Sequence, residues 1–93
     1  MVDFVWLDER HGSWVAQLSD DELSGLKQEL VFLELKTGYF LDPYSNTRLA
    51  PDHARLLSDA IKANRPKSKA IERFVTMLDE SVLSDRWIMV VGD

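Results

Sequence analysis

The sequence contains no cysteine, and among its 93 residues are only four glycines and three prolines. The missing thiols exclude disulfides, thiolate zinc sites, iron–sulfur clusters and cysteine nucleophiles. Four scattered glycines do not form the phosphate-binding loops of nucleotide enzymes. The serine-nucleophile motif Gly-x-Ser-x-Gly, and Ser-x-x-Lys with its supporting elements, are absent as well. We therefore expect no cofactor and no enzymatic activity.

Long hydrophobic runs are also missing. No stretch approaches the roughly 20 apolar residues that span a bilayer, and the N-terminal residues lack the basic region of a signal peptide. The chain is 45% hydrophobic and 29% charged, which is typical of a folded globular protein. These features predict one soluble, cytoplasmic domain that covers residues 1–93 and has no membrane contact.

Basic residues are in deficit, with 11 against 16 acidic residues and a net charge of −5. The charge is segregated: residues 1–35 carry −6, residues 36–76 carry +4 and residues 77–93 carry −3. An acidic chain is a poor general binder of nucleic acid and favours a basic partner.

Three segments have the composition of strands. Residues 2–7 alternate Val2, Phe4 and Trp6 on one face, and residues 13–18 are expected to return antiparallel after a turn around Gly12. Residues 87–91 are apolar on both faces, which predicts a strand beside the first one. An apolar last strand could pair edge to edge with a second copy, and this leaves a homodimer open.

Helix signals are clearer. Ser19 and Glu22 form a capping box, and the apolar pattern behind them predicts one helix up to Gly38, with a stripe of Leu23, Leu26, Leu30, Leu33 and Leu35 that Val31 and Phe32 widen. Gly25 inside this helix suggests a close backbone contact. Further helices are predicted over 51–63 and from Ser68 to about Leu83, with a short extended piece at 39–41 and a turn at 42–45.

This order of elements, β-β-α-α-α-β, predicts a small α+β domain. Three helices should pack on one face of a small, mostly antiparallel sheet of three strands. Trp6, Trp14 and Trp87 lie on the three predicted strands and are expected in an aromatic core.

Residues 42–53 are the densest cluster of side chains suited to specific recognition. Tyr44, Asn46, Arg48 and His53 would face a partner, because Tyr and Arg are enriched at binding hot spots. In the structural alternative, Asp42 caps its own turn, Arg48 forms an ion pair and Tyr44 covers the edge of the core.

A second candidate is the acidic group of Asp20, Asp21 and Glu22, with Asp8 and Glu9 nearby in the sequence. Acids in a first helical turn are ordinary capping residues. Functionally, they would form a negative face that steers a basic protein toward the chain and mimics phosphates.

Two alternatives come from other classes. Lys62, Arg65, Lys67, Lys69 and Arg73 around the junction 62–73 could contact phosphates in a nucleic-acid-associated regulator, although we do not expect nucleic-acid binding. A small hydrolase or metal site near Asp52 and His53, or near His11, would need further ligands, and neither context matches a metal-binding signature.

The favoured hypothesis is a non-enzymatic protein-binding domain, an acidic inhibitor with a protein partner, itself basic. Its small size, its acidity and its lack of cofactor motifs resemble, in these gross features, the bacterial immunity proteins that neutralise toxins. No motif assigns the chain to a family.

Overall fold

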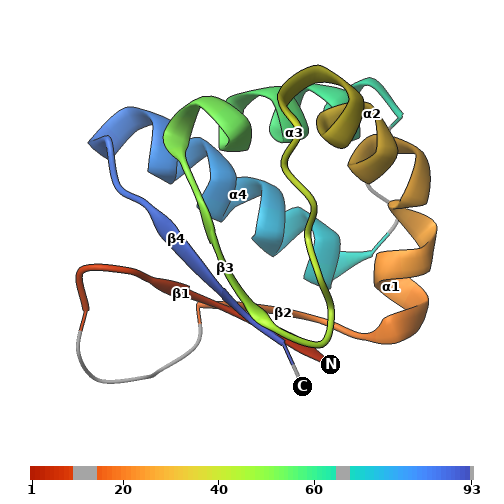
Figure 1. Ribbon diagram of the computed structural model, residues 1–93, viewed down its shortest axis with the longest axis horizontal. Helices are drawn as coiled ribbons and strands as arrows, with labels where there is room; N and C mark the ends of the chain where they lie inside the picture. The colour runs from red at the N-terminus through yellow and green to blue at the C-terminus, as the bar shows by residue number, and fades with distance from the viewer. Residues whose placement is uncertain (10–14, 65–67, 93) are drawn as a thin grey trace.

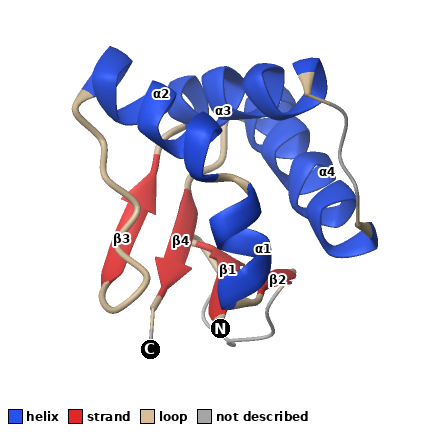
Figure 2. Ribbon diagram, turned by 90° about the vertical axis from the view of Figure 1, so that its right-hand side faces the viewer, coloured by secondary structure: helices blue, strands red, loops and turns tan. Residues whose placement is uncertain are grey.

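The computed structural model describes residues 1–9, 15–64 and 68–92 and has a four-stranded sheet with four helices on one side of it (Figures 1 and 2). The elements are β1 (Val2–Trp6), β2 (Ala16–Leu18), α1 (Asp20–Gly25), α2 (Lys27–Thr37), β3 (Asn46–Leu49), α3 (Pro51–Ala63), α4 (Lys69–Ser84) and β4 (Ile88–Val91). This is the expected α+β class, with one more helix and one more strand than the sequence predicts. Within the described ranges no helix has the length and apolarity needed to cross a membrane.

The sheet has the order β2-β1-β4-β3, and every neighbouring pair is antiparallel. Every second residue of β1 faces the helices, as predicted. These residues are Val2, Phe4 and Trp6, and all three are buried. The ring centroids of Phe4 and of Phe74 on α4 lie 4.3 Å apart. The tilted aromatic pair joins the centre of the sheet to the helix layer.

The terminal strand β4 lies beside β1, as predicted, but it is also paired with β3 on its other side. Both of its edges are therefore occupied, and the predicted edge-to-edge pairing of this strand with a second copy is wrong. The edges of the sheet are β2 and β3. Dimerisation by another route stays a prediction.

Strand β3 lies inside residues 42–53, the segment expected to recognise a partner and not expected to contain a strand. The predicted extended piece was 39–41, whereas the strand is Asn46–Leu49. Only Thr47 in it is a residue that favours strands, so the local preference is weak. Pairing with β4 holds this segment in a strand. In that pairing Leu49 lies opposite Ile88 and is fully buried.

The first helical region begins as predicted and then breaks. Ser19 Oγ accepts a hydrogen bond from the Glu22 amide (3.2 Å), and Glu22 Oε1 accepts one from the Ser19 amide (2.8 Å). The helix stops at Gly25, Leu26 adopts a non-helical conformation, and α2 continues to Gly38 at φ 79°. A Cβ on Gly25 would meet nothing within 4 Å, so the predicted close contact there is wrong; the glycine precedes the break instead.

Helices α3 and α4 agree with their predicted ranges, and Ser68 caps α4 through the Ile71 amide. A polar link joins the two helices: Asp79 accepts a hydrogen bond from Ser58 Oγ (2.6 Å) and lies 2.8 Å from Lys62 Nζ. Burial raises the pKa of Asp79, but the bonds from Lys62 and Ser58 outweigh it, and the pKa is lowered from its usual 3.8.

We expect Asp79→Asn to destabilise the protein by about 1 kcal/mol at pH 7. Because the folded-state pKa is lowered, the carboxylate stabilises the fold above the unfolded-state value near 3.8, and this contribution disappears as the pH falls through the folded-state value. Denaturant unfolding at pH 7 and below pH 4 should therefore show a difference between Asp79→Asn and wild type that shrinks in acid. Asp59→Asn, an exposed carboxylate on α3, is the control; an equal pattern there would contradict the assignment.

The backbone after β4 packs tightly against the turn that precedes β3. The Gly92 amide donates to the Ser45 carbonyl oxygen (3.1 Å). A Cβ on Gly92 would lie 2.6 Å from Ser45 N and O and 2.8 Å from Pro43 O, all backbone atoms. Only glycine allows this approach.

Gly92→Ala should therefore destabilise the protein by about 1–3 kcal/mol, the usual cost of overpacking. Gly25→Ala is the matched control: it adds the same methyl group in open space and should be neutral or stabilising by up to about 1 kcal/mol. Chemical denaturation measures both free energies of unfolding. Equal effects of the two substitutions would contradict the close approach at Gly92.

Candidate functional site

Helix α2 has apolar side chains on more than one face. Leu33 is buried, as the predicted stripe requires, but Val31 is 44% and Leu35 81% exposed, and Phe32 is exposed beside them. The expectation that Leu35 belongs to the buried stripe, widened by Val31 and Phe32, is therefore wrong. A surface helix normally has one apolar face and one polar face. The second apolar face of α2 faces solvent.

The segment that follows α2 turns one aromatic ring inward and the next outward. Tyr39 is half-buried; its hydroxyl lies 2.7 Å from Thr47 Oγ1 on β3, and burial raises its pKa. Leu41 is buried, while Phe40 between them is 59% exposed. Tyr39 and Leu41 therefore anchor this segment to the rest of the fold, and Phe40 between them faces solvent.

The turn at residues 42–45 positions Tyr44. Asp42 accepts hydrogen bonds from the Tyr44 amide (2.8 Å) and from Ser45 Oγ (2.9 Å). The interpretation that Asp42 caps its own turn is confirmed. Tyr44 does not cover the edge of the core, because it is 79% exposed.

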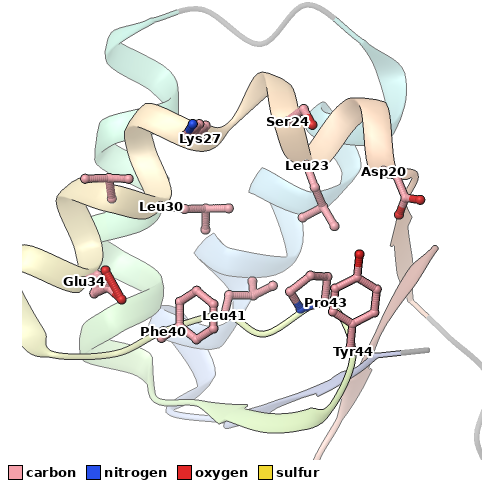
Figure 3. A pocket seen from close by; sticks show the side chains of 11 residues that line it. Asp20, Leu23, Ser24, Lys27, Leu30, Glu34, Phe40, Leu41, Pro43 and Tyr44 are labelled. Atoms are coloured by element: carbon pink, nitrogen blue, oxygen red, sulfur yellow. The ribbon is translucent and has the colours of Figure 1, made fainter.

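These elements enclose a groove of about 410 Å³, which we call the α1–α2 groove (Figure 3). Leu23 of α1 and Leu30 and Val31 of α2 line one wall, and the segment from Phe40 to Tyr44 lines the other. The volume lies within the range of typical binding pockets, about 300–1,000 Å³. The groove is mostly apolar and opens beside the exposed face of α2.

Charged side chains lie around the groove. Asp20 on α1 and Glu34 on α2 occupy opposite ends, and Lys27 lies at the junction of the two helices (Figure 3). The amino group of Met1 lies 3.6 Å from the Asp20 carboxylate, but both groups are exposed, and such a pair contributes little.

The structure brings two of the predicted binding residues together, since Asp20 and Tyr44 both line the α1–α2 groove. Asp21 is exposed next to Asp20, on the same short helix. Glu22 has both carboxylate oxygens engaged, by the Ser19 amide and by Ser68 Oγ (3.3 Å), and these bonds lower its pKa.

The other predicted residues lie elsewhere. Asn46 and Arg48 are exposed on the face of β3 opposite to Leu49, which faces the helices. His53 is half-buried at the start of α3, and its ring centroid lies 5.4 Å from that of Tyr39. The stretch from 42 to 53 is therefore not one recognition loop.

The metal alternative has no ligand set in the part of the chain that the structure describes, where no three His, Cys, Asp or Glu side chains gather. His53 Nδ1 is buried and has no hydrogen-bond partner, next to the Tyr39 ring rather than to a carboxylate. His11 lies outside the described residues.

The basic junction is only partly free. Lys62 forms an ion pair with Asp79, while Lys69 and Arg73 are exposed on α4. Arg65 and Lys67 lie outside the described residues. The phosphate-contact alternative thus keeps two exposed cations in the described part of the junction.

The two acids that follow β1 share one cation, Arg86. Arg86 donates to Asp8 Oδ1 (2.8 Å) and to Glu9 Oε1 (3.0 Å), and its guanidinium lies 4.2 Å from the centroid of the buried Trp6 ring. These bonds lower the pKa of Asp8 and raise that of Arg86.

The tryptophans do not form one core. Trp6 is buried, as predicted, but Trp87 is 47% exposed, and this part of the core prediction is wrong. Trp87 falls one residue before β4, out of phase with the inward-facing Ile88. Trp14 lies outside the described residues.

The spacing Ser-x-x-Lys does occur, at Ser24 and Lys27, without its accompanying motifs. Both residues line the α1–α2 groove and both are exposed. A lysine that activates a serine needs a desolvated site. Lys27 therefore does not meet the requirement for a catalytic base.

Comparisons of the chain with models of known families, with curated proteins and with solved structures find no match. The groove is thus described from its own geometry. Sequence reasoning missed Val31, Phe32, Leu35 and Phe40 as surface residues. The available signal was the excess of apolar residues in 30–35, more than one helical stripe can bury.

If the exposed apolar face of α2 does not stabilise the fold, Val31→Ser should change the free energy of unfolding by less than about 0.5 kcal/mol. Leu33→Ala on the buried face of the same helix should cost about 2–5 kcal/mol. Chemical denaturation of both variants measures this contrast. A cost for Val31→Ser as large as that for Leu33→Ala would place Val31 in the core.

Proposed function

We propose that this chain is a non-enzymatic protein-binding domain that inhibits a basic partner protein by docking a segment of it in the α1–α2 groove. The proposal rests on one observation: α2 carries a second apolar face, and that face continues into an apolar groove with acidic ends. Burying apolar surface is the main driving force of association, and an exposed apolar patch of this kind marks an interaction site.

The extent of the apolar surface favours a macromolecular partner. Val31, Leu35, Phe40 and Tyr44 are each between 44% and 81% exposed, and Val31 and Leu35 are one helical turn apart on the same face. A small ligand would fill the groove and leave Leu35 uncovered, whereas a polypeptide can cover both.

Charge favours a basic partner over a second copy. Two copies that each carry −5 repel one another, and an isologous contact through the groove would bring Asp20 and Glu34 near the same groups of the other copy. A positively charged protein is attracted instead, and long-range attraction accelerates its association. This is the behaviour expected of an inhibitor that must capture its target quickly.

The experiment is affinity purification at low salt from the native cells, with wild type and two variants as bait. Val31→Ser/Phe40→Ser removes the apolar rim of the groove, and Leu83→Ser removes an exposed apolar side chain from α4, away from the groove. Wild type and Leu83→Ser should retain one basic protein in stoichiometric amount, and the groove variant should lose it. The retained protein should then lose activity when purified wild-type chain is added.

Retention of the same protein by all three baits would contradict the groove as the docking site. A retained protein that keeps its activity in the complex would contradict inhibition. Recovery of no protein in stoichiometric amount would contradict the binding function as a whole.

A further inference from the structure

We infer that the segment bound in the α1–α2 groove has an apolar centre and one basic side chain at each end. This inference rests on the proposed function and adds the chemistry of the bound segment. Three features of the groove carry it: the position of its two carboxylates, the apolar surface between them and the position of its lysine.

The two carboxylates are separated along the groove. Figure 3 shows Asp20 at the end formed by the start of α1 and Glu34 at the end toward the last turn of α2. Both are exposed, and neither is held in the helical caps that occupy Glu22. Asp20 makes only the exposed 3.6 Å pair with the Met1 amino group, which contributes little, so a cation that arrives with a partner can replace it. Glu34 can pair with a second such cation at the other end.

Between the two ends the surface is apolar. Leu23 and Leu30 on one wall and Leu41 on the other point toward the hollow, with Pro43 beside them (Figure 3). A charged or strongly polar side chain of the bound segment that lay against this apolar surface would lose its hydration and gain no polar partner. Such a side chain is therefore disfavoured. The centre of the bound segment must therefore be apolar.

Lys27 strengthens this assignment. It lines the groove at the α1–α2 junction, between Asp20 and Glu34 in the sequence and in Figure 3. A third basic side chain in the middle of the bound segment would meet this ammonium group, and like charges repel. The groove thus favours basic groups at both ends and disfavours them at the centre.

The expected size of the effect is modest, because these are rim charges. Exposed ion pairs contribute about 0.2–1 kcal/mol, so loss of one carboxylate should weaken binding by about 1.4-fold to fivefold. Their larger role is to select the sequence and its register in the groove, while the apolar centre supplies most of the affinity.

The test selects peptides from a displayed library of random 12-residue sequences on three purified baits. These are wild type, Asp20→Lys/Glu34→Lys, and Asp59→Lys/Glu72→Lys, which changes the net charge equally at exposed sites away from the groove. Peptides that also bind Val31→Ser/Phe40→Ser are removed beforehand. Wild type and the charge control should select Lys or Arg on both sides of an apolar core, and the groove-reversed bait should select Asp or Glu there.

One selected peptide then gives a quantitative check by fluorescence anisotropy. Asp20→Asn should weaken its binding about 1.4-fold to fivefold, and replacing the matching basic residue of the peptide by Ala should remove that difference. Glu34→Gln should behave in the same way toward the other end of the peptide. The coupling of each carboxylate to a different end also gives the direction of the bound segment.

Each contrary outcome has a distinct meaning. Selection of the same flanking residues by wild type and the groove-reversed bait would overturn this inference and leave the groove as a docking site. Failure to select any peptide that distinguishes wild type from Val31→Ser/Phe40→Ser would overturn both. A dimer of the purified chain in sedimentation equilibrium that Val31→Ser/Phe40→Ser abolishes would make a second copy the occupant and overturn the inference.

Discussion

The antiparallel ladder between β1 and β4 is the constraint on which the rest of the structure depends. It joins the two ends of the chain, places β4 between β1 and β3, and makes one continuous sheet from segments that are 40 to 90 residues apart. Because α4 leads directly into β4, the same pairing lays α4 over the sheet, with Phe74 against Phe4. The pairing also draws β3 into the sheet and so anchors the segment 39–45, which forms one wall of the groove.

This arrangement leaves α2 with more apolar surface than it can bury. The helices lie on one side of a four-stranded sheet, and α3 and α4 cover much of it (Figure 2). Helix α2 packs mainly against α3 and buries Leu33 in the core, whereas Val31 and Leu35 are exposed. In a domain of 93 residues this is a direct result of size, since a small fold has few interior positions. The exposed face is therefore available for an intermolecular contact.

Much of the fold could be predicted because local signals and tertiary packing agree. Ser19, Ser68 and Pro51 mark helix starts by their own hydrogen-bonding and backbone chemistry, and the alternation in residues 2–7 fixes the inward face of β1. Strand β3 was not predicted because it is held in place by pairing with β4, which is far away in the sequence. The groove was missed for the same reason: which apolar residues of α2 are buried depends on where α3 lies, and neither periodicity nor propensity contains that information.

The positions of the acidic residues matter more for binding than the total net charge does. Asp8 and Glu9 are paired with Arg86, Glu22 is held by the α1 cap and by Ser68, and Asp79 is paired with Lys62. These carboxylates are engaged in hydrogen bonds and ion pairs within the fold. Asp20 and Glu34 are different, because they are exposed beside the apolar surface of the groove, and a cation that pairs with either of them also brings its neighbouring side chains to the groove. The proximity of exposed carboxylates and uncovered apolar surface, more than the net charge of −5, is what makes this face suited to a basic protein segment.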